Sequence, residues 1–235
     1  MKKRTKIIVS AAGAAVIVII IIVSPYLSMK PAATGEIPGA GIYAVKDKIV
    51  CLYLIDTGGG YIAVDAGIDS KGISNTLAGL GIPAEKVTHV FLTHSDADHT
   101  AATTLFTNAQ ICMSEDEIQL LDGTTKRTGA AGNQLPGRDD LSGITLLGSN
   151  QTLTIGGRTI ECIKAPGHTP GSMLYLIDGK YLFTGDAFKA KNGARSVHPY
   201  TMDKKTASAT IRSLDGLLSE TEMILTAHYG CFPAG

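Results

Sequence analysis

The chain of 235 residues contains no tryptophan, and only 6% of its residues are aromatic. Proteins that bind single-stranded nucleic acid stack bases on aromatic side chains, so the composition does not support such a surface. An excess of one charge is also lacking, because 21 basic and 21 acidic residues give a formal net charge of zero. All the acidic residues lie at or after Glu36, so the remainder of the chain is mildly acidic. A DNA- or RNA-binding function is therefore not expected.

Cysteine is scarce, and the four cysteines (Cys51, Cys112, Cys162 and Cys231) show no Cys-x-x-Cys spacing. That spacing is typical of thiol redox motifs and of cysteine-rich metal sites. The first three lie in apolar, strand-like runs, where a free cysteine packs as a small hydrophobic residue. Packing is the predicted role of all four, although Cys231 lies three residues after the candidate ligand His228.

Long apolar runs are absent except at the N-terminus, where residues 7–23 carry no charge and follow a basic cluster. A helix of 17 residues just spans a bilayer core, and the positive-inside rule places its basic end in the cytoplasm. A cleaved signal peptide is the alternative, which would give a secreted protein, but no small-x-small cleavage site follows the run. We predict a basic N-terminus and transmembrane anchor at residues 1–24, a tether at 25–39, and an extracytoplasmic catalytic domain at 40–235.

After the tether, short apolar runs alternate with turns. Strands are predicted at 42–46, 49–55, 61–65, 87–93, 109–113, 144–147, 151–155, 158–164, 172–177, 180–184 and 223–226. Helices are predicted at 70–80, 100–106 and 203–218, and from Glu115 after a Ser114 cap, where acidic residues suit a helix N-terminus. Residues 122–142 are polar and lack periodicity, and a loop of that length is usually functional or disordered. This order of elements favours an α/β fold, an αββα sandwich of two mixed β-sheets flanked by helices.

Four imidazoles and three carboxylates follow predicted strands or lie in tight loops: His94, Asp96, Asp98, His99, His168, Asp186 and His228. His94 and Asp96 alternate along an extended segment, so their side chains can face the same way. Asp186 can bridge two cations, because a carboxylate has two oxygens. The set is large enough for two adjacent divalent metals, an arrangement that suits a hydroxide whose pKa is lowered toward neutrality.

The motifs at 93–99, 166–172, 184–186 and 227–230 resemble, in order and spacing, those of metallo-β-lactamase-fold hydrolases. The resemblance extends over most of the chain and implies the αββα fold, a small-molecule substrate and two divalent metal ions. It implies one ion held by His94, Asp96 and His168, and a second held by Asp98, His99 and His228, with Asp186 bridging. Zinc is expected because it is the common metal of the superfamily.

The resemblance also implies roles beside the ligands. Asp65 matches the family's strand-end aspartate, which accepts hydrogen bonds from the ligand loop. Asp98 is the predicted catalytic residue, which would orient or take a proton besides binding metal. From their positions alone, His198, twelve residues after Asp186, and Tyr229, next to a ligand, are candidate substrate contacts. Ordinary loop and packing roles are the alternatives for both.

One position departs from the family pattern His-x-His-x-Asp-His, because Asp96 stands where the second histidine is expected. A carboxylate is a harder ligand than imidazole and shifts the preference toward manganese or iron. The flavodiiron branch of the superfamily also has a carboxylate there and uses iron. Metal identity therefore stays open between zinc and these two.

The predicted function is a membrane-anchored, extracytoplasmic binuclear hydrolase that uses a metal-bound hydroxide on a small ester, thioester, lactone or lactam. A di-iron oxidoreductase of the same fold is one alternative, disfavoured because the chain has no flavin domain and no rubredoxin-like cysteine pairs. A non-catalytic metal-binding sensor is the other alternative. The intact Asp98, His99, Asp186 and His228 count against it.

Overall fold

The computed structural model describes residues 26–129, 132–137, 141–191 and 194–234. The predicted anchor lies outside these residues. Within the described part of the chain, no helix has both the length and the apolar character needed to cross a bilayer.

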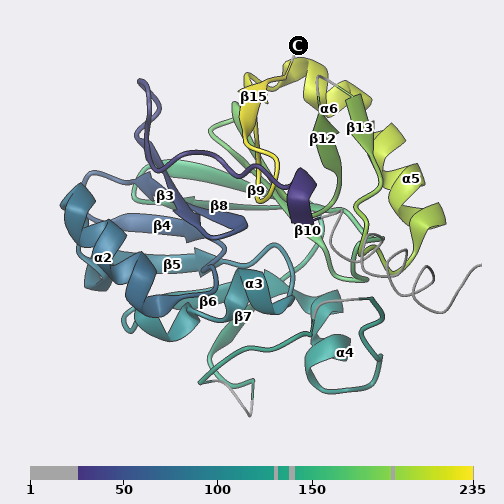
Figure 1. Cartoon of the computed structure of the whole chain (residues 1–235), viewed down its shortest axis with the longest axis horizontal. Coiled ribbons are helices and arrows are strands. Elements are labelled where there is room, and N and C mark those ends of the chain that lie inside the picture. The colour runs from purple at the N-terminus through teal and green to yellow at the C-terminus, as the bar shows by residue number, and fades with distance from the viewer. Residues whose placement is uncertain (1–25, 130–131, 138–140, 192–193, 235) are drawn as a thin grey trace, which may run out of the picture.

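Two mixed sheets form the centre of the molecule (Figure 1). The first has the order β1-β2-β3-β4-β5-β6-β7, antiparallel from β1 to β4 and parallel from β4 to β7. Its strands are β1 (Gly35–Ile37), β2 (Ile42–Asp47), β3 (Val50–Asp56), β4 (Tyr61–Val64), β5 (Val87–Phe91), β6 (Gln110–Ser114) and β7 (Ile144–Leu147).

The second sheet has the order β15-β14-β11-β10-β9-β8, in which β11 and β14 are parallel and the other neighbours antiparallel. Its strands are β8 (Gln151–Ile155), β9 (Arg158–Lys164), β10 (Met173–Ile177), β11 (Tyr181–Gly185), β14 (Met223–Thr226) and β15 (Cys231–Pro233). A separate hairpin pairs β12 (Lys189–Lys191) with β13 (Ala194–Ser196).

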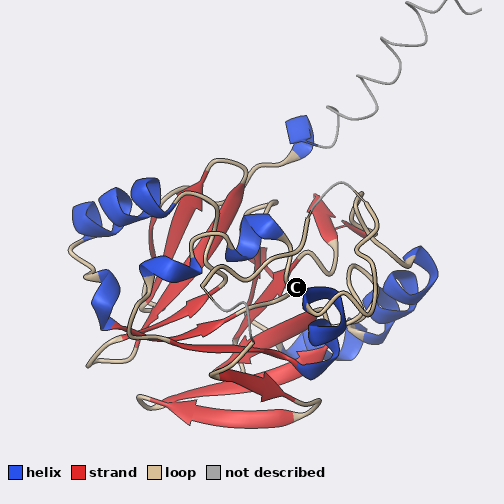
Figure 2. Ribbon diagram, turned by 90° about the horizontal axis from the view of Figure 1, so that it is seen from below, coloured by secondary structure: helices blue, strands red, loops and turns tan. Residues whose placement is uncertain are grey.

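Helices cover the outer faces of the sheets (Figure 2). The helices on these outer faces are α2 (Ser70–Leu80), α5 (Lys204–Ser213) and α6 (Asp215–Glu220). Shorter helices and turns are η1 (Ala84–Lys86), α3 (Ala97–Thr100), η2 (Thr103–Leu105), η3 (Glu115–Glu117) and α4 (Ile118–Leu121). The boundaries of α2 have local causes. Asp69 Oδ1 accepts a hydrogen bond from the Gly72 N–H (3.1 Å) at its start, and Gly81 ends it in the left-handed conformation (φ 71°).

Three separate apolar clusters define the layers. The cluster between the two sheets contains the rings of Phe91, Tyr175 and Phe183. A second cluster packs α2 against the outer face of the first sheet, and a third packs α5 and α6 against the second sheet. The layers are therefore stacked in the order helix, sheet, sheet, helix, which is an αββα sandwich. The predicted fold class is confirmed for the described residues.

Some predicted elements differ from those observed. The helix predicted at 203–218 is divided at Leu214 into α5 and α6, and the helix predicted at 100–106 is replaced by two single turns, α3 and η2. The structured domain also begins before residue 40. Strand β1 lies in the predicted tether and pairs with β2. Strands of three residues, such as β1 and β15, show too little alternation to be recognised from sequence.

Candidate metal centre

The seven predicted ligands converge at one edge of the sandwich, beyond the carboxyl ends of three strands. His94 follows β5, Asp186 follows β11, and His228 follows β14. Asp96 immediately precedes α3, which carries Asp98 and His99, and His168 lies in the loop before β10. All of these except Asp98 are buried. Parallel pairing of β11 with β14 brings two of the three strand ends together.

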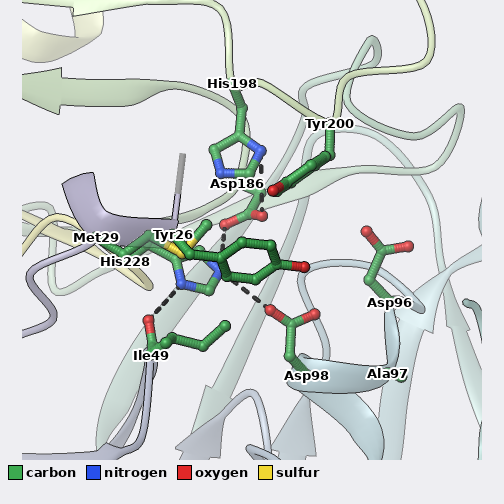
Figure 3. Close-up of a pocket in the computed structure, with 10 residues that line it drawn as sticks. All are labelled: Tyr26, Met29, Ile49, Asp96, Ala97, Asp98, Asp186, His198, Tyr200 and His228. Atoms are coloured by element: carbon green, nitrogen blue, oxygen red, sulfur yellow. Dashed lines mark hydrogen bonds and ion pairs between the residues drawn. The ribbon is translucent and has the colours of Figure 1, made fainter. Parts of the chain in front are cut away.

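One half of the site fits a divalent cation directly. Ligand atoms of Asp98, His99 and His228 lie within 4.8 Å of one another. His228 Nε2 is 3.3 Å from both Asp98 Oδ2 and Asp186 Oδ1 (Figure 3). His99 Nε2 is 3.7 Å from Asp186 Oδ1, is buried, and has no hydrogen-bond partner among the described residues. A buried, unpaired imidazole nitrogen facing carboxylates has the donor chemistry of a metal ligand.

Hydrogen bonds on the far side of each ring orient these two histidines. His99 Nδ1 donates to Asp65 Oδ2 (2.8 Å), and His228 Nδ1 donates to the Ile49 carbonyl (2.6 Å). Asp65 Oδ1 also accepts a hydrogen bond from the Thr93 N–H (2.8 Å). Both rings therefore turn Nε2 toward the site, and Asp65 lies where the sequence placed it, beneath the ligand loop.

The other half of the site contains an arginine side chain besides its predicted ligands. Ligand atoms of His94, Asp96 and His168 also lie within 4.8 Å of one another, but the guanidinium of Arg127 stands among them. Arg127 Nε donates to Asp96 Oδ1 and Nη2 to Asp96 Oδ2, each at 2.6 Å. Nη2 is also 3.3 Å from His168 Nε2.

Arg127 is thus a site residue that the sequence reasoning missed. It lies in the segment 122–142, where no motif or periodicity marks it. Its side chain is 2% exposed and is held further by the carbonyls of Thr128 and Tyr200. A buried arginine paired bidentately with a carboxylate is a strong, oriented contact.

Glu117 is a second missed residue. From the sequence it is one of three acidic residues expected at a helix N-terminus, yet its side chain is fully buried. Oε1 accepts hydrogen bonds from the N–H and hydroxyl of Ser95 (2.8 and 2.7 Å). Oε2 accepts from the Thr169 hydroxyl (2.7 Å) and the Gly171 N–H (3.0 Å). One carboxylate therefore ties the loop of His94 and Asp96 to the loop of His168.

A small cavity of about 180 Å³ opens onto the ligands (Figure 3). Besides site residues, its lining includes Tyr26, Met29, Ile49 and Tyr200. The tether residues Tyr26 and Met29 therefore form part of the wall. The ten lining residues include neither lysine nor arginine.

The two candidate substrate contacts lie beside this cavity. His198 lines it, is buried, and places Nδ1 3.5 Å from Asp186 Oδ2. Burial lowers the pKa of His198 to about 3, so its imidazole is neutral at physiological pH. The ring of Tyr229 is centred 5.9 Å from that of His198. His198 also forms a close group with His168 and Asp186, so it has the position of a ligand as well as that of a substrate contact.

Charge pairing dominates the titration of the site. Burial lowers the pKa of His99, but Asp65, Asp98 and Asp186 outweigh it and raise that pKa to about 9. Burial raises the pKa of Asp98, but His99 and His228 outweigh it and lower that pKa to about 2. The Asp96 carboxyl is likewise buried, yet Arg127 and the neighbouring histidines hold its pKa well below the usual range. The carboxylates are therefore ionised, as metal binding requires.

Comparison with known families agrees with this geometry. A model of the metallo-β-lactamase superfamily matches residues 49–228. The chain is 34% identical over 152 residues to the uncharacterized protein YobT of Bacillus subtilis, covering 60% of this chain and 63% of that protein. It is 34% identical over 129 residues to the probable polyketide biosynthesis zinc-dependent hydrolase PksB of the same organism, covering 53% and 48%. The chain thus spans less than two thirds of the length of these relatives.

Solved structures share the fold. A subclass B3 metallo-β-lactamase of Bradyrhizobium japonicum superposes with a TM-score of 0.66 at 22% identity, covering 86% of this chain and 80% of that one. A β-lactamase from Chitinophaga pinensis gives a TM-score of 0.65 at 21% identity, with the same coverage. At this level of identity the likeness concerns the architecture.

Proposed function

Because the chain belongs to the metallo-β-lactamase superfamily, we propose that it is a metal-dependent hydrolase. The observation that carries the proposal is the cluster of Asp98, His99, Asp186 and His228, in which two oriented imidazoles face two ionised carboxylates at the end of a cavity. The relative described as a probable zinc-dependent hydrolase supports zinc as the metal. Iron and manganese remain the alternatives that Asp96 suggests.

The residues of the site support hydrolysis at a polarised carbonyl. A divalent ion, when bound, supplies Lewis acidity that polarises a carbonyl and acidifies water. Asp98 is the ligand-cluster residue whose side chain is substantially exposed, at 23%, toward the cavity. We propose that its carboxylate, ionised at neutral pH, orients a water molecule or accepts its proton.

The cavity favours a small, uncharged acyl compound. About 180 Å³ holds only a small group, and the aromatic and aliphatic side chains of Tyr26, Met29, Ile49 and Tyr200 suit apolar atoms next to the reacting carbonyl. We propose an ester, thioester, lactone or lactam as substrate. The lack of lysine and arginine in the cavity wall disfavours a phosphate ester.

We further propose that residues 7–23 anchor the protein in the cell membrane with its catalytic domain outside the cytoplasm. The uncharged run and its basic flank support this proposal. Labelling of cysteines introduced near residues 3 and 40 in intact cells tests it. Modification of the second position alone, by a reagent that does not cross the membrane, is the expected result.

The hydrolase proposal is tested with the full chain in detergent and a panel of chromogenic esters, thioesters, lactones and β-lactams. Hydrolysis should disappear with a chelator and return with zinc. Asp98→Asn should lower kcat at least about 100-fold at matched metal content. The matched control is Asp116→Asn, because Asp116 is an exposed acid paired with Lys164 at 2.6 Å. Full activity of Asp98→Asn would refute the role of Asp98, and metal uptake without any hydrolysis would favour the sensor alternative.

A further inference from the structure

The half of the site built from His94, Asp96 and His168 contains a protein cation. Both carboxylate oxygens of Asp96 accept hydrogen bonds at 2.6 Å from the Arg127 guanidinium, and Nη2 lies 3.3 Å from His168 Nε2. The positive charge thus lies beside two of the three residues that would hold an ion there, and these two also contact each other, with His168 Nε2 3.1 Å from Asp96 Oδ2.

We infer that Arg127 competes with a metal ion for Asp96, so that the two halves of the site take up metal unequally. The half built from Asp98, His99, Asp186 and His228 binds an ion directly. An ion at His94, Asp96 and His168 binds only when the guanidinium leaves Asp96. The inference rests on the proposed function, since it presumes a metal-binding site.

The bonding capacity of the groups supports competition. A carboxylate that receives a bidentate guanidinium offers its oxygens in the same plane and direction that a cation would use. Arginine cannot lose its proton in a protein, so its charge also repels a divalent ion at short range. A rise in pH therefore does not release Asp96 from Arg127, whereas deprotonation does free a histidine or a cysteine to bind metal.

The surroundings of Arg127 make its departure costly. The side chain is 2% exposed, and its remaining donors reach the carbonyl oxygens of Thr128 and Tyr200. Moving it leaves those two carbonyls without partners and removes two charged hydrogen bonds from Asp96, which would keep His168 Nε2 at 3.1 Å, unless an ion or water replaces the guanidinium. This pairing gives a physical reason for Asp96 in place of the family's second histidine. A carboxylate at position 96 can bind an arginine bidentately, and a neutral imidazole cannot.

Zinc titration of the full chain in detergent, with a competing chromogenic chelator and elemental analysis of the final stoichiometry, tests the inference. The wild type should bind one zinc tightly and a second at least about tenfold more weakly. Arg127→Met should strengthen the weaker site by tenfold or more and change the tighter site less than twofold. Arg127→Lys, which keeps the charge but loses the paired geometry, should fall between them.

Arg158→Met is the matched control. Arg158 donates to Asp178 at 2.6 Å, its side chain is 22% exposed, and both residues line a different hollow that contains no candidate ligand. It should leave both zinc affinities unchanged. Two zincs bound with the same affinities in the wild type and in Arg127→Met would overturn the inference while leaving the proposed hydrolase intact. No uptake of zinc, iron or manganese by the wild type or any variant would overturn both.

A second measurement covers the case in which Arg127→Met does not fold. Cobalt added to the wild type should give two successive sets of visible absorption bands, the first complete near one equivalent. Both sets rising together from the first addition would overturn the inference without recourse to a variant.

Discussion

Glu117→Ala is expected to destabilise the protein by about 3–5 kcal/mol, because it removes four hydrogen bonds inside a fully buried contact. A hydrogen bond to a charged group contributes about 1.5–3 kcal/mol. The sum over the four bonds is therefore larger than the loss of stability that we expect. Water entering the space left by the side chain would recover part of it, and losses from broken buried charge networks are about 3–5 kcal/mol. Urea unfolding followed by circular dichroism, with chelator present to exclude metal linkage, measures the effect.

Two variants sharpen this experiment. Glu117→Gln keeps the shape but turns an amide N–H₂ toward donors, and should cost about 2–3 kcal/mol. Glu115→Ala removes an acid from the same turn whose side chain is 55% exposed and reaches Lys164 at 3.2 Å, so it should cost less than about 1 kcal/mol. Equal losses from Glu117→Ala and Glu115→Ala would refute the idea that Glu117 joins the two ligand loops.

Two further predictions concern stability. Gly171→Ala should cost about 1–3 kcal/mol in urea unfolding, because a Cβ there would overlap the backbone of Glu117; Gly79→Ala, where nothing lies within 4 Å, should instead stabilise α2 by about 0.5–1 kcal/mol. The free energy of unfolding of chelator-treated protein should fall by up to about 3 kcal/mol as the pH rises from 6.5 to about 9. The pKa of His99 is raised from 6.5 to about 9 by folding, so its ion pairs stabilise the protein fully below pH 6.5 and are lost as the pH passes 9. Zinc-loaded protein should lack this loss, since the metal binds neutral imidazole; equal slopes for the two forms would contradict the assignment.

Local sequence patterns were enough to predict most of the fold. Helix α2 matches its predicted bounds because Asp69 and Gly81 mark both ends, and β8 and β9 match theirs because polar turns flank them. Helix 203–218 was predicted as continuous because its apolar period continues through Leu214. No glycine or proline stands at the break itself, and the nearest glycine, Gly216, lies inside α6, so the position is not marked in the sequence.

The site was predictable as far as its motifs extend. The ligand-type residues were found because each lies in a short, recognisable run, and the structure brings them to one edge. Whether they bind metal stays a prediction. Arg127 and Glu117 were missed for another reason. Their partners lie 31 residues away for Asp96 and 52 for Thr169, and a lone arginine or glutamate has no pattern that reveals a distant contact.

The wall contributed by Tyr26 and Met29 has a topographical consequence. The Lys30 N–H donates to the His228 carbonyl at 2.7 Å, which fastens the start of the domain to the strand end that carries a site residue. In a chain anchored through residue 24, at most about 7 Å of backbone separates the bilayer segment from Tyr26. The cavity mouth would then face the headgroups, and the enzyme would sample compounds partitioned into or released from the membrane surface. Its effective substrate concentration would be an areal density, governed by lateral diffusion in the plane of the membrane.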